Sequence, residues 1–160
     1  MEQGNVIQNL INVAQNSLET TYFPQDYNAM LNGLSCVPDE SILEKYIRYS
    51  LQGYYPTQLL DYVAQNDVLP NGSRLYNFMV NNLIDVVKST NFERFVQNMV
   101  IGWSTDAQLS QLNSFDWQSL ILNSEQANAW NNAISRVNQT RSWLNSYKKD
   151  ISDWLNSNFS

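Results

Sequence analysis

The sequence predicts an all-α fold, and three observations lead to that class. Apolar residues recur at spacings of three and four along the chain, which is the pattern of amphipathic helices and not the alternation of half-buried strands. Only five Gly and four Pro interrupt the 160 residues, so long segments are free to form helices. Hydrophobic residues make up 43% and aromatic residues 12%, enough for the core of a single domain over residues 1–160.

Proline and capping residues divide the first half of the chain into five expected helices. Pro24 and Pro56 suit first helical turns. Asp39 and Ser73 are expected to cap the third and fifth helices. The third helix is expected to end at Gly53. The expected helices cover residues 5–18, 24–34, 39–53, 56–63 and 73–86.

The second half is expected to hold four more helices. Thr105 and Gln108 have the spacing of a capping box. From Ser124 a helical stripe continues for five turns, and Ser146 is a candidate cap for a last helix. The expected ranges are 92–103, 105–115, 124–144 and 146–155, with an irregular loop at 116–123.

The order of these helices indicates an architecture. Grouped in pairs, they recur every 30 to 40 residues or so, which suits antiparallel hairpins. We therefore expect a HEAT-like α-solenoid of about eight or nine antiparallel helices in stacked hairpins. An irregular helical bundle has the same periodicity and stays open as an alternative.

Composition argues against several functions. The chain has 9 Lys and Arg against 15 Asp and Glu, a net charge of −6, so a nucleic-acid partner is not expected. It has no histidine, which removes His-activated nucleophiles and His-ligated zinc. We expect no catalytic, metal-binding or cofactor-binding residue in this chain. The single cysteine, Cys36, is in the simplest interpretation a small buried hydrophobic residue.

A few polar and aromatic positions need separate interpretation. Asp39, Glu40 and Glu44 cluster at a helix start, where capping and the helix dipole explain them. The charged residues Lys148, Lys149, Asp150 and Asp153 are expected to be solvated. Three tryptophans lie next to turns or off the helical stripes and are candidates to line a groove or an interface: Trp103, Trp117 and Trp143.

Three triplets have the N-x-Ser/Thr pattern of glycosylation acceptors. Their asparagines are Asn71, Asn138 and Asn158. Asn71 lies on a Pro-Asn-Gly turn and is expected to be the most accessible. Asn138 lies within an expected helix and would be modified only if it faces solvent.

Three segments together resemble one family. Residues 103–115, WSTDAQLSQLNSF, are similar to the F-S-T-x-x-E-L-x-x-x-x-x-F stretch near the end of aminopeptidase N-type zinc aminopeptidases. Here Trp103 replaces the Phe and Gln108 the Glu. Trp143-Leu144 and Trp154-Leu155, eleven residues apart, resemble the family's final helices.

Further matches lie upstream. Residues 30–36, MLNGLSC, followed by Leu43 and Tyr46-Ile47, resemble the family's A-L-x-C … L-x-R-Y-L element, with Lys45 where Arg is usual. Residues 76–78, YNF, stand where the family has W-x-F. Leu59 stands where the family tends to have Asp.

The resemblance implies the C-terminal helical domain, often called the ERAP-like C-terminal domain, of such an enzyme. In that family this domain closes over the catalytic domain, shapes a chamber for peptides and in some members supplies a homodimer contact. The family's zinc motif belongs to a separate domain and does not occur in this sequence. The resemblance also implies an extracellular or cell-surface location. A free-standing α-solenoid that binds proteins is the alternative.

The resemblance gives Cys36 a further expectation. Members that work outside the cell commonly pair the cysteine of this element with another about one hairpin earlier. In this chain that point falls at or just before Met1. We therefore expect a disulfide between Cys36 and a residue outside the chain.

Overall fold

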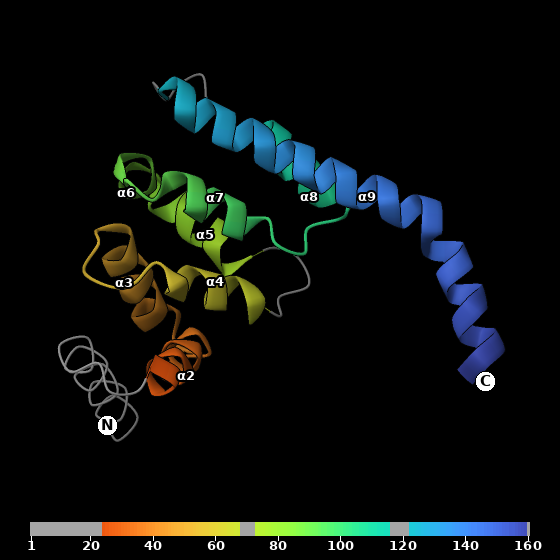
Figure 1. Cartoon of the computed structure of the whole chain (residues 1–160). Helices are drawn as coiled ribbons and strands as arrows, with labels where there is room; N and C mark the ends of the chain where they lie inside the picture. The colour runs from red at the N-terminus through yellow and green to blue at the C-terminus, as the bar shows by residue number, and fades with distance from the viewer. Residues whose placement is uncertain (1–23, 68–72, 116–121, 160) are drawn as a thin grey trace.

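The computed structural model describes residues 24–67, 73–115 and 122–159, and within these ranges it contains eight helices and no strand (Figure 1). The all-α prediction is confirmed. The helices are α2 (Pro24–Ser35), α3 (Glu40–Leu51), α4 (Gln58–Gln65), α5 (Arg74–Asn81), α6 (Leu83–Lys88), α7 (Phe92–Met99), α8 (Asp106–Ser114) and α9 (Ser124–Phe159). The helix expected at 5–18 and most of the loop expected at 116–123 lie outside the described residues.

The helices stack in the order of the chain. Helices α2, α3 and α4 lie at one end, α5, α6 and α7 pack next to them, and α8 and α9 cover the other end (Figure 1). Buried side chains of every helix from α2 to α9 form one continuous core, which includes Phe78 and Phe95 with ring centroids 6.1 Å apart. This stacking is compatible with a solenoid, and a HEAT-type repeat stays a prediction.

Local capping signals form as the sequence indicates. Asp39 Oδ1 accepts hydrogen bonds from the Ser41 amide at 3.0 Å and from the Ser41 hydroxyl at 2.7 Å, and the hydroxyl contributes most to lowering the pKa of Asp39. Ser73 accepts from the Tyr76 amide at 2.9 Å. Thr105 and Gln108 complete the expected capping box. The bonds from the Ser41, Tyr76 and Gln108 amides satisfy donors that the first helical turn leaves without a partner.

Two helix boundaries differ from the prediction. The expected fifth helix breaks at Asn82, whose backbone leaves the helical region and whose side-chain amide donates to the Phe78 carbonyl oxygen at 3.0 Å. Such a bond competes with the backbone ladder. The expected sixth helix stops at Met99, and Gly102 beyond it takes φ +78°, a conformation that favours glycine.

The two helices expected at the end of the chain are one helix of 36 residues, α9. Ser146 is not a cap, because its hydroxyl donates to the Ser142 carbonyl oxygen at 3.0 Å within the helix. The segment after Asn123 contains neither Pro nor Gly, so no residue there stops the helix. None of the helices in the described ranges is long and apolar enough to cross a membrane.

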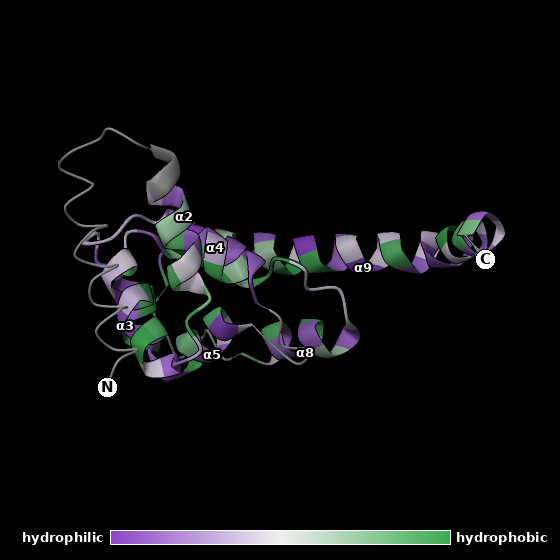
Figure 2. Cartoon of the chain, turned by 90° about the horizontal axis from the view of Figure 1, so that it is seen from below, coloured by the Kyte–Doolittle hydropathy of each residue, from purple (hydrophilic) through white to green (hydrophobic). Residues whose placement is uncertain are grey.

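Only the first part of α9 packs against the body, where Ala129, Trp130, Ala133 and Val137 are buried on α7 and α8. The rest of the helix projects past the other helices (Figures 1 and 2) and bends in its C-terminal third (Figure 1). The Ser146-to-Ser142 bond lies in the projecting part of α9, and hydroxyl bonds of this kind often bend helices.

Candidate functional site

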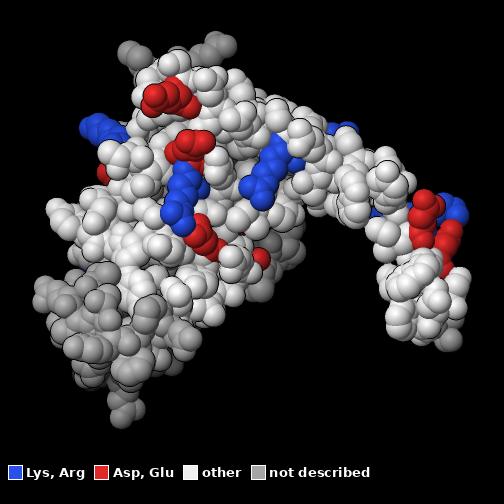
Figure 3. Space-filling view, viewed as in Figure 1, with Lys and Arg blue, Asp and Glu red and all other residues white. Residues whose placement is uncertain are grey.

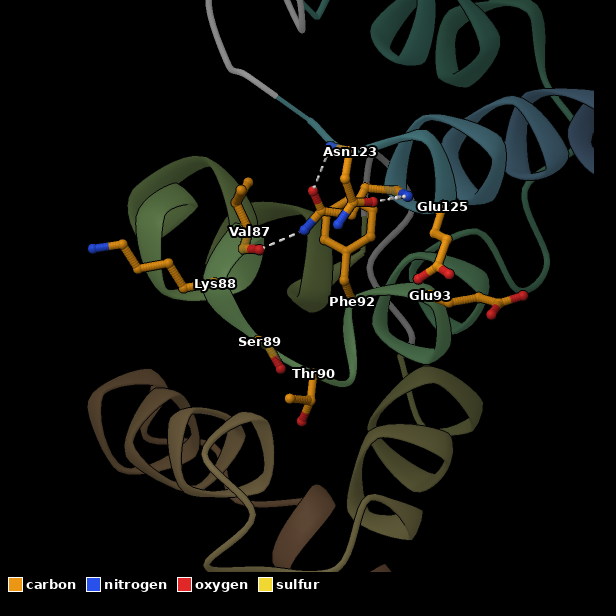
Figure 4. Close-up of a pocket in the computed structure, with 9 residues that line it drawn as sticks. Val87, Lys88, Ser89, Thr90, Phe92, Glu93, Asn123 and Glu125 are labelled. Carbon is orange, nitrogen blue, oxygen red and sulfur yellow. Dashed lines mark hydrogen bonds between the residues drawn. The ribbon is translucent and has the colours of Figure 1, made fainter.

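Two adjoining cavities form an open polar groove along the turn between α6 and α7. The first, about 390 Å³, lies between this turn and the start of α9 and is lined by Val87, Lys88, Ser89, Thr90, Phe92, Glu93, Asn123, Glu125 and Gln126 (Figure 4). The second, about 340 Å³, lies between the end of α3 and the same turn and is lined by Arg48, Leu51, Gln52, Asp85, Lys88, Ser89 and Thr90. Lys88, Ser89 and Thr90 line both cavities. We call the two cavities together the α6–α7 groove.

Hydrogen bonds hold the α6–α7 turn on the end of α3. The Ser89 hydroxyl donates to the Leu51 carbonyl oxygen at 2.9 Å and accepts from the Asn91 amide at 3.0 Å. The Asn91 side chain donates to the Ser50 carbonyl oxygen at 3.4 Å. These bonds satisfy carbonyl groups at a helix end, where no intrahelical donor remains, and they fix the floor of the groove.

The start of α9 forms the opposite wall. Asn123 and Gln126 cap each other, with the Gln126 amide donating to Asn123 Oδ1 at 2.8 Å and the Asn123 amide donating to Gln126 Oε1 at 3.1 Å. Gln126 Nε2 also donates to the Val87 carbonyl oxygen at 2.6 Å (Figure 4). One glutamine therefore caps α9 and ties it to the end of α6.

The charges of the groove are unevenly placed. Glu93 and Glu125, in the first turns of α7 and α9, both line the first cavity, whereas the Lys88 side chain points away from them (Figure 4). Gln97 donates to Glu93 at 3.0 Å. In the second cavity Arg48 pairs with Asp85 at 3.0 Å. Positive and negative side chains lie next to one another on this face of the body (Figure 3).

The groove offers hydrogen bonds and charge, and its donor set does not suit a transition metal. The chain lacks histidine and has one cysteine, and the described residues contain no group of three His, Cys, Asp or Glu that could hold a metal ion. The residues of the groove do not fit a catalytic zinc site, because such sites need histidine or thiolate ligands. The zinc that the resemblance implies is expected in a separate domain.

The structure corrects the simplest interpretation of Cys36. Its side chain is exposed, not buried, in the turn that follows α2. The Cys36 amide donates to the Gly33 carbonyl oxygen at 3.2 Å. The thiol is therefore accessible, and the disulfide with a residue outside the chain stays a prediction.

The three acceptor asparagines have different surroundings. Asn71 lies outside the described residues. Asn138 is half-buried on α9 and accepts from Arg141 at 3.4 Å. Asn158 is exposed, and its side chain donates to the Trp154 carbonyl oxygen at 2.7 Å.

The three candidate tryptophans also differ in their surroundings. Trp103 is only 3% exposed and packs on Tyr76 with ring centroids 5.5 Å apart, so it belongs to the core and the expectation of a groove position was wrong. Trp117 lies outside the described residues. Trp143 is 53% exposed and contacts Tyr147, with ring centroids 5.5 Å apart.

Trp143 belongs to a row of exposed large side chains on the projecting part of α9. We call this row the α9 apolar face; it consists of Trp143, Tyr147, Ile151, Trp154, Leu155 and Phe159. The charged residues that the sequence places on this segment behave as expected of solvated groups, with Lys149 and Asp153 paired at 2.6 Å.

Sequence reasoning did not find the α6–α7 groove. Glu93 and Glu125 each look like an ordinary acidic residue at a helix start. Only the fold places both in the lining of one cavity, so no sequence motif indicates that they belong to one site. Of the acids that the sequence did single out, Asp39 caps α3, and Glu40 pairs with Arg74 on α5 at 2.8 Å.

No protein-family model matches the chain. The fold and groove define an all-helical domain without a metal-binding cluster in its described residues. The chain is similar to part of a peptidase: a Caenorhabditis elegans protein named "Putative aminopeptidase-2" is 32% identical to it over 141 residues, 86% of the chain. The chain spans 7% of the length of that relative.

Proposed function

We propose that this chain is the non-catalytic C-terminal helical domain of an aminopeptidase N-type zinc aminopeptidase. The observation that carries the proposal is the 32% identity to an aminopeptidase over most of the chain. The segments at 30–36 and 103–115 add support, because they resemble elements near the end of such enzymes. In this proposal the enzyme works outside the cell or at its surface, and its zinc is held by a separate catalytic domain.

The role of such a domain follows from its construction. Stacked helices can adjust slightly at each interface, so the domain can move as a cover over a neighbouring domain. Closure over the catalytic domain would enclose peptides and complete the catalytic site there. The contribution of this chain to the reaction is therefore control of access, with peptides and the catalytic domain of its own polypeptide as partners.

The α6–α7 groove is the surface that we assign to peptides. It offers the Thr90 hydroxyl and the carboxylates of Glu93 and Glu125 next to the ring of Phe92. An extended peptide can use such polar groups for hydrogen bonds. The two carboxylates favour a positively charged side chain at this end of the groove.

Fluorescence anisotropy with labelled peptides tests this assignment. We expect a Lys-containing peptide to bind the chain more tightly than its Glu-containing counterpart. The double variant Glu93→Gln/Glu125→Gln should weaken binding of the Lys peptide about tenfold and leave the Glu peptide unchanged or tighter. Glu44→Gln, on α3 and outside both cavities, is the matched control. Equal binding of both peptides to all three proteins would contradict the assignment.

A free-standing helical module that binds other proteins is the second candidate. The projecting α9 apolar face favours it, because large exposed apolar surfaces mark sites of association. The two candidates differ in the polypeptide that carries this sequence in the cell. An aminopeptidase domain must be joined to a catalytic domain, whereas a free-standing module needs none.

A further inference from the structure

The lysines and arginines of this chain fall into two groups by their surroundings. The sequence has nine of them, and all lie within the described ranges. Four arginines are partly buried, and each forms an ion pair with a neighbouring helix: Arg48 with Asp85, Arg74 with Glu40, Arg94 with Asp61, and Arg141 with Asp106. The others are exposed: Lys45, Lys88, Arg136, Lys148 and Lys149. The exposed group is what the folded chain presents to an enzyme that binds basic side chains.

Three of the exposed basic residues lie on backbone that the core holds in place. Lys45 precedes two buried residues of α3, and Arg136 precedes the buried Val137. Lys88 lies at the end of α6, beside the turn that hydrogen bonds fasten to α3 and α9. Opening the backbone at any of these positions disrupts core contacts, and such openings are rare in a folded protein.

Lys148 and Lys149 have no such support. They are adjacent in the sequence, and the Lys149 side chain is 84% exposed. No described residue of α9 after Val137 is buried, and the charged group of this segment stands apart from the charges of the body (Figure 3). Lys149 pairs with Asp153 at 2.6 Å within the same helix, a type of surface pair that adds little stability.

The helix around this pair therefore opens easily. An isolated helix of about 15 residues or fewer has little stability in water, because most helical stability in proteins comes from packing. The end of α9 packs on nothing in the described residues, so it can unfold locally while the body stays folded. An endoprotease needs such a locally opened backbone, and its rate follows the population of the open form.

We propose that the Lys148-Lys149 pair is a processing site for an endoprotease of the trypsin type, which cleaves after basic residues. The specificity pocket of such an enzyme carries a carboxylate that binds the lysine side chain. Water is the second reactant. In hydrolysis after Lys149 the amide bond to Asp150 breaks, Lys149 gains a carboxylate and Asp150 gains a free amine.

Cleavage there would change the surface of the protein and leave its body intact. The released residues 150–160 carry four members of the α9 apolar face, namely Ile151, Trp154, Leu155 and Phe159. Every buried residue of α9 stays with the body. The proposal uses no residue of the α6–α7 groove and does not depend on the aminopeptidase assignment.

Limited digestion of the purified chain with trypsin, followed by intact-mass spectrometry, tests the proposal. The residues outside the described ranges contain no Lys or Arg, so every trypsin site lies on a described helix. We expect the first cut after Lys148 or Lys149, about tenfold or more faster than any other cut. The double variant Lys148→Gln/Lys149→Gln should lose this first product.

Arg136→Gln is the matched control, because Arg136 is exposed on the same helix but lies where α9 packs on the body. This variant should give the same first product at the same rate as the original chain. A first cut after Arg136, Lys45 or Lys88 would overturn the proposal. So would equal cutting after all of the exposed basic residues, because exposure alone would then govern cleavage.

A pair of variants at Ser152 tests local opening as the reason for cleavage. Ser152 is exposed on α9 close to the proposed site. Glycine and alanine differ in helix propensity by an amount that changes an opening equilibrium about fivefold. We expect Ser152→Gly to be cut about fivefold faster than Ser152→Ala. Equal rates for the two variants would overturn the role of local opening.

Discussion

Arg74, the first residue of α5, donates from Nη2 to the carbonyl oxygen of Val37 at 2.8 Å. The same guanidinium donates to the Ser35 carbonyl oxygen at 3.1 Å and to Glu40 at 2.8 and 2.9 Å. One side chain of α5, 13% exposed, thus binds two carbonyl groups at and after the end of α2 and a carboxylate at the start of α3.

Replacing Arg74 should therefore destabilise the fold more than replacing a surface arginine. Arg74→Gln leaves two carbonyl groups without their charged donor, and hydrogen bonds to charged groups are worth about 1.5–3 kcal/mol. We expect a loss of about 2 kcal/mol in the free energy of unfolding, measured by urea titration. Arg136→Gln, at an exposed position on α9, should change it by less than about 0.5 kcal/mol. Equal effects of both substitutions would show that the Arg74 bonds contribute little.

The tyrosines beside α3 predict an alkaline transition. Burial, with neighbouring tyrosines adding to it, raises the pKa of Tyr55 to about 12. A raised pKa in the folded state means that this group's contribution to stability is complete below pH 10 and is lost as the pH rises toward 12. The total loss is on the order of 2 kcal/mol.

Tyr55→Phe should remove this loss. The Tyr55 hydroxyl has no hydrogen-bond partner among the described residues, so the variant should also be about 1 kcal/mol more stable at pH 7. The measurement is urea unfolding at pH 7, 10 and 11. Tyr54→Phe, at a residue 70% exposed, is the control and should follow the original chain. Parallel curves for Tyr55→Phe and the original chain would contradict the prediction.

The acceptor asparagines should differ in occupancy if the protein passes through the secretory pathway, as we propose. Asn138 is half-buried and engaged by Arg141, and the hydroxyl of Thr140, the third residue of its triplet, donates to the Arg136 carbonyl oxygen at 3.0 Å. We expect Asn71 to carry a glycan and Asn138 to remain unmodified. Peptide mapping by mass spectrometry after expression in animal cells measures both. A modified Asn138 beside a bare Asn71 would reverse the expected order.

Cys36 should behave differently in the isolated chain and in its natural polypeptide. In the isolated chain its exposed thiol should react with maleimide without denaturant. In the natural polypeptide we expect labelling only after reduction, because the thiol would be bridged to a cysteine outside this sequence. The assay compares denatured protein with and without reductant. Equal labelling under both conditions would rule out the bridge.

Local signals in the sequence predicted the parts of the fold that depend on neighbouring residues. The caps at Asp39, Ser73 and Thr105 formed because each needs only the three residues that follow it. The break at Asn82 was missed because an asparagine within a helical stripe is usually tolerated. The continuity of α9 was missed because serine is a common helix-capping residue. Ser146, however, lies between segments that both favour helix.

The α6–α7 groove could not be predicted in the same way. Its walls come from the end of α3, the α6–α7 turn and the start of α9, which the chain brings together only after folding. Gln126 illustrates this, since its bond with Asn123 is a local capping pattern whereas its bond to Val87 spans 39 residues. The exposure of Cys36 likewise depends on how the turn after α2 lies on the body.

Affinity capture of the natural protein with an antibody against this chain tests the central claim most directly. The captured polypeptide is sized on a denaturing gel and assayed with a fluorogenic aminoacyl amide, with and without a metal chelator. We predict a polypeptide several times larger than the 18.5 kDa of this chain that releases the fluorophore and loses this activity with chelator. A captured protein of about 18.5 kDa without such activity would contradict the assignment to an aminopeptidase.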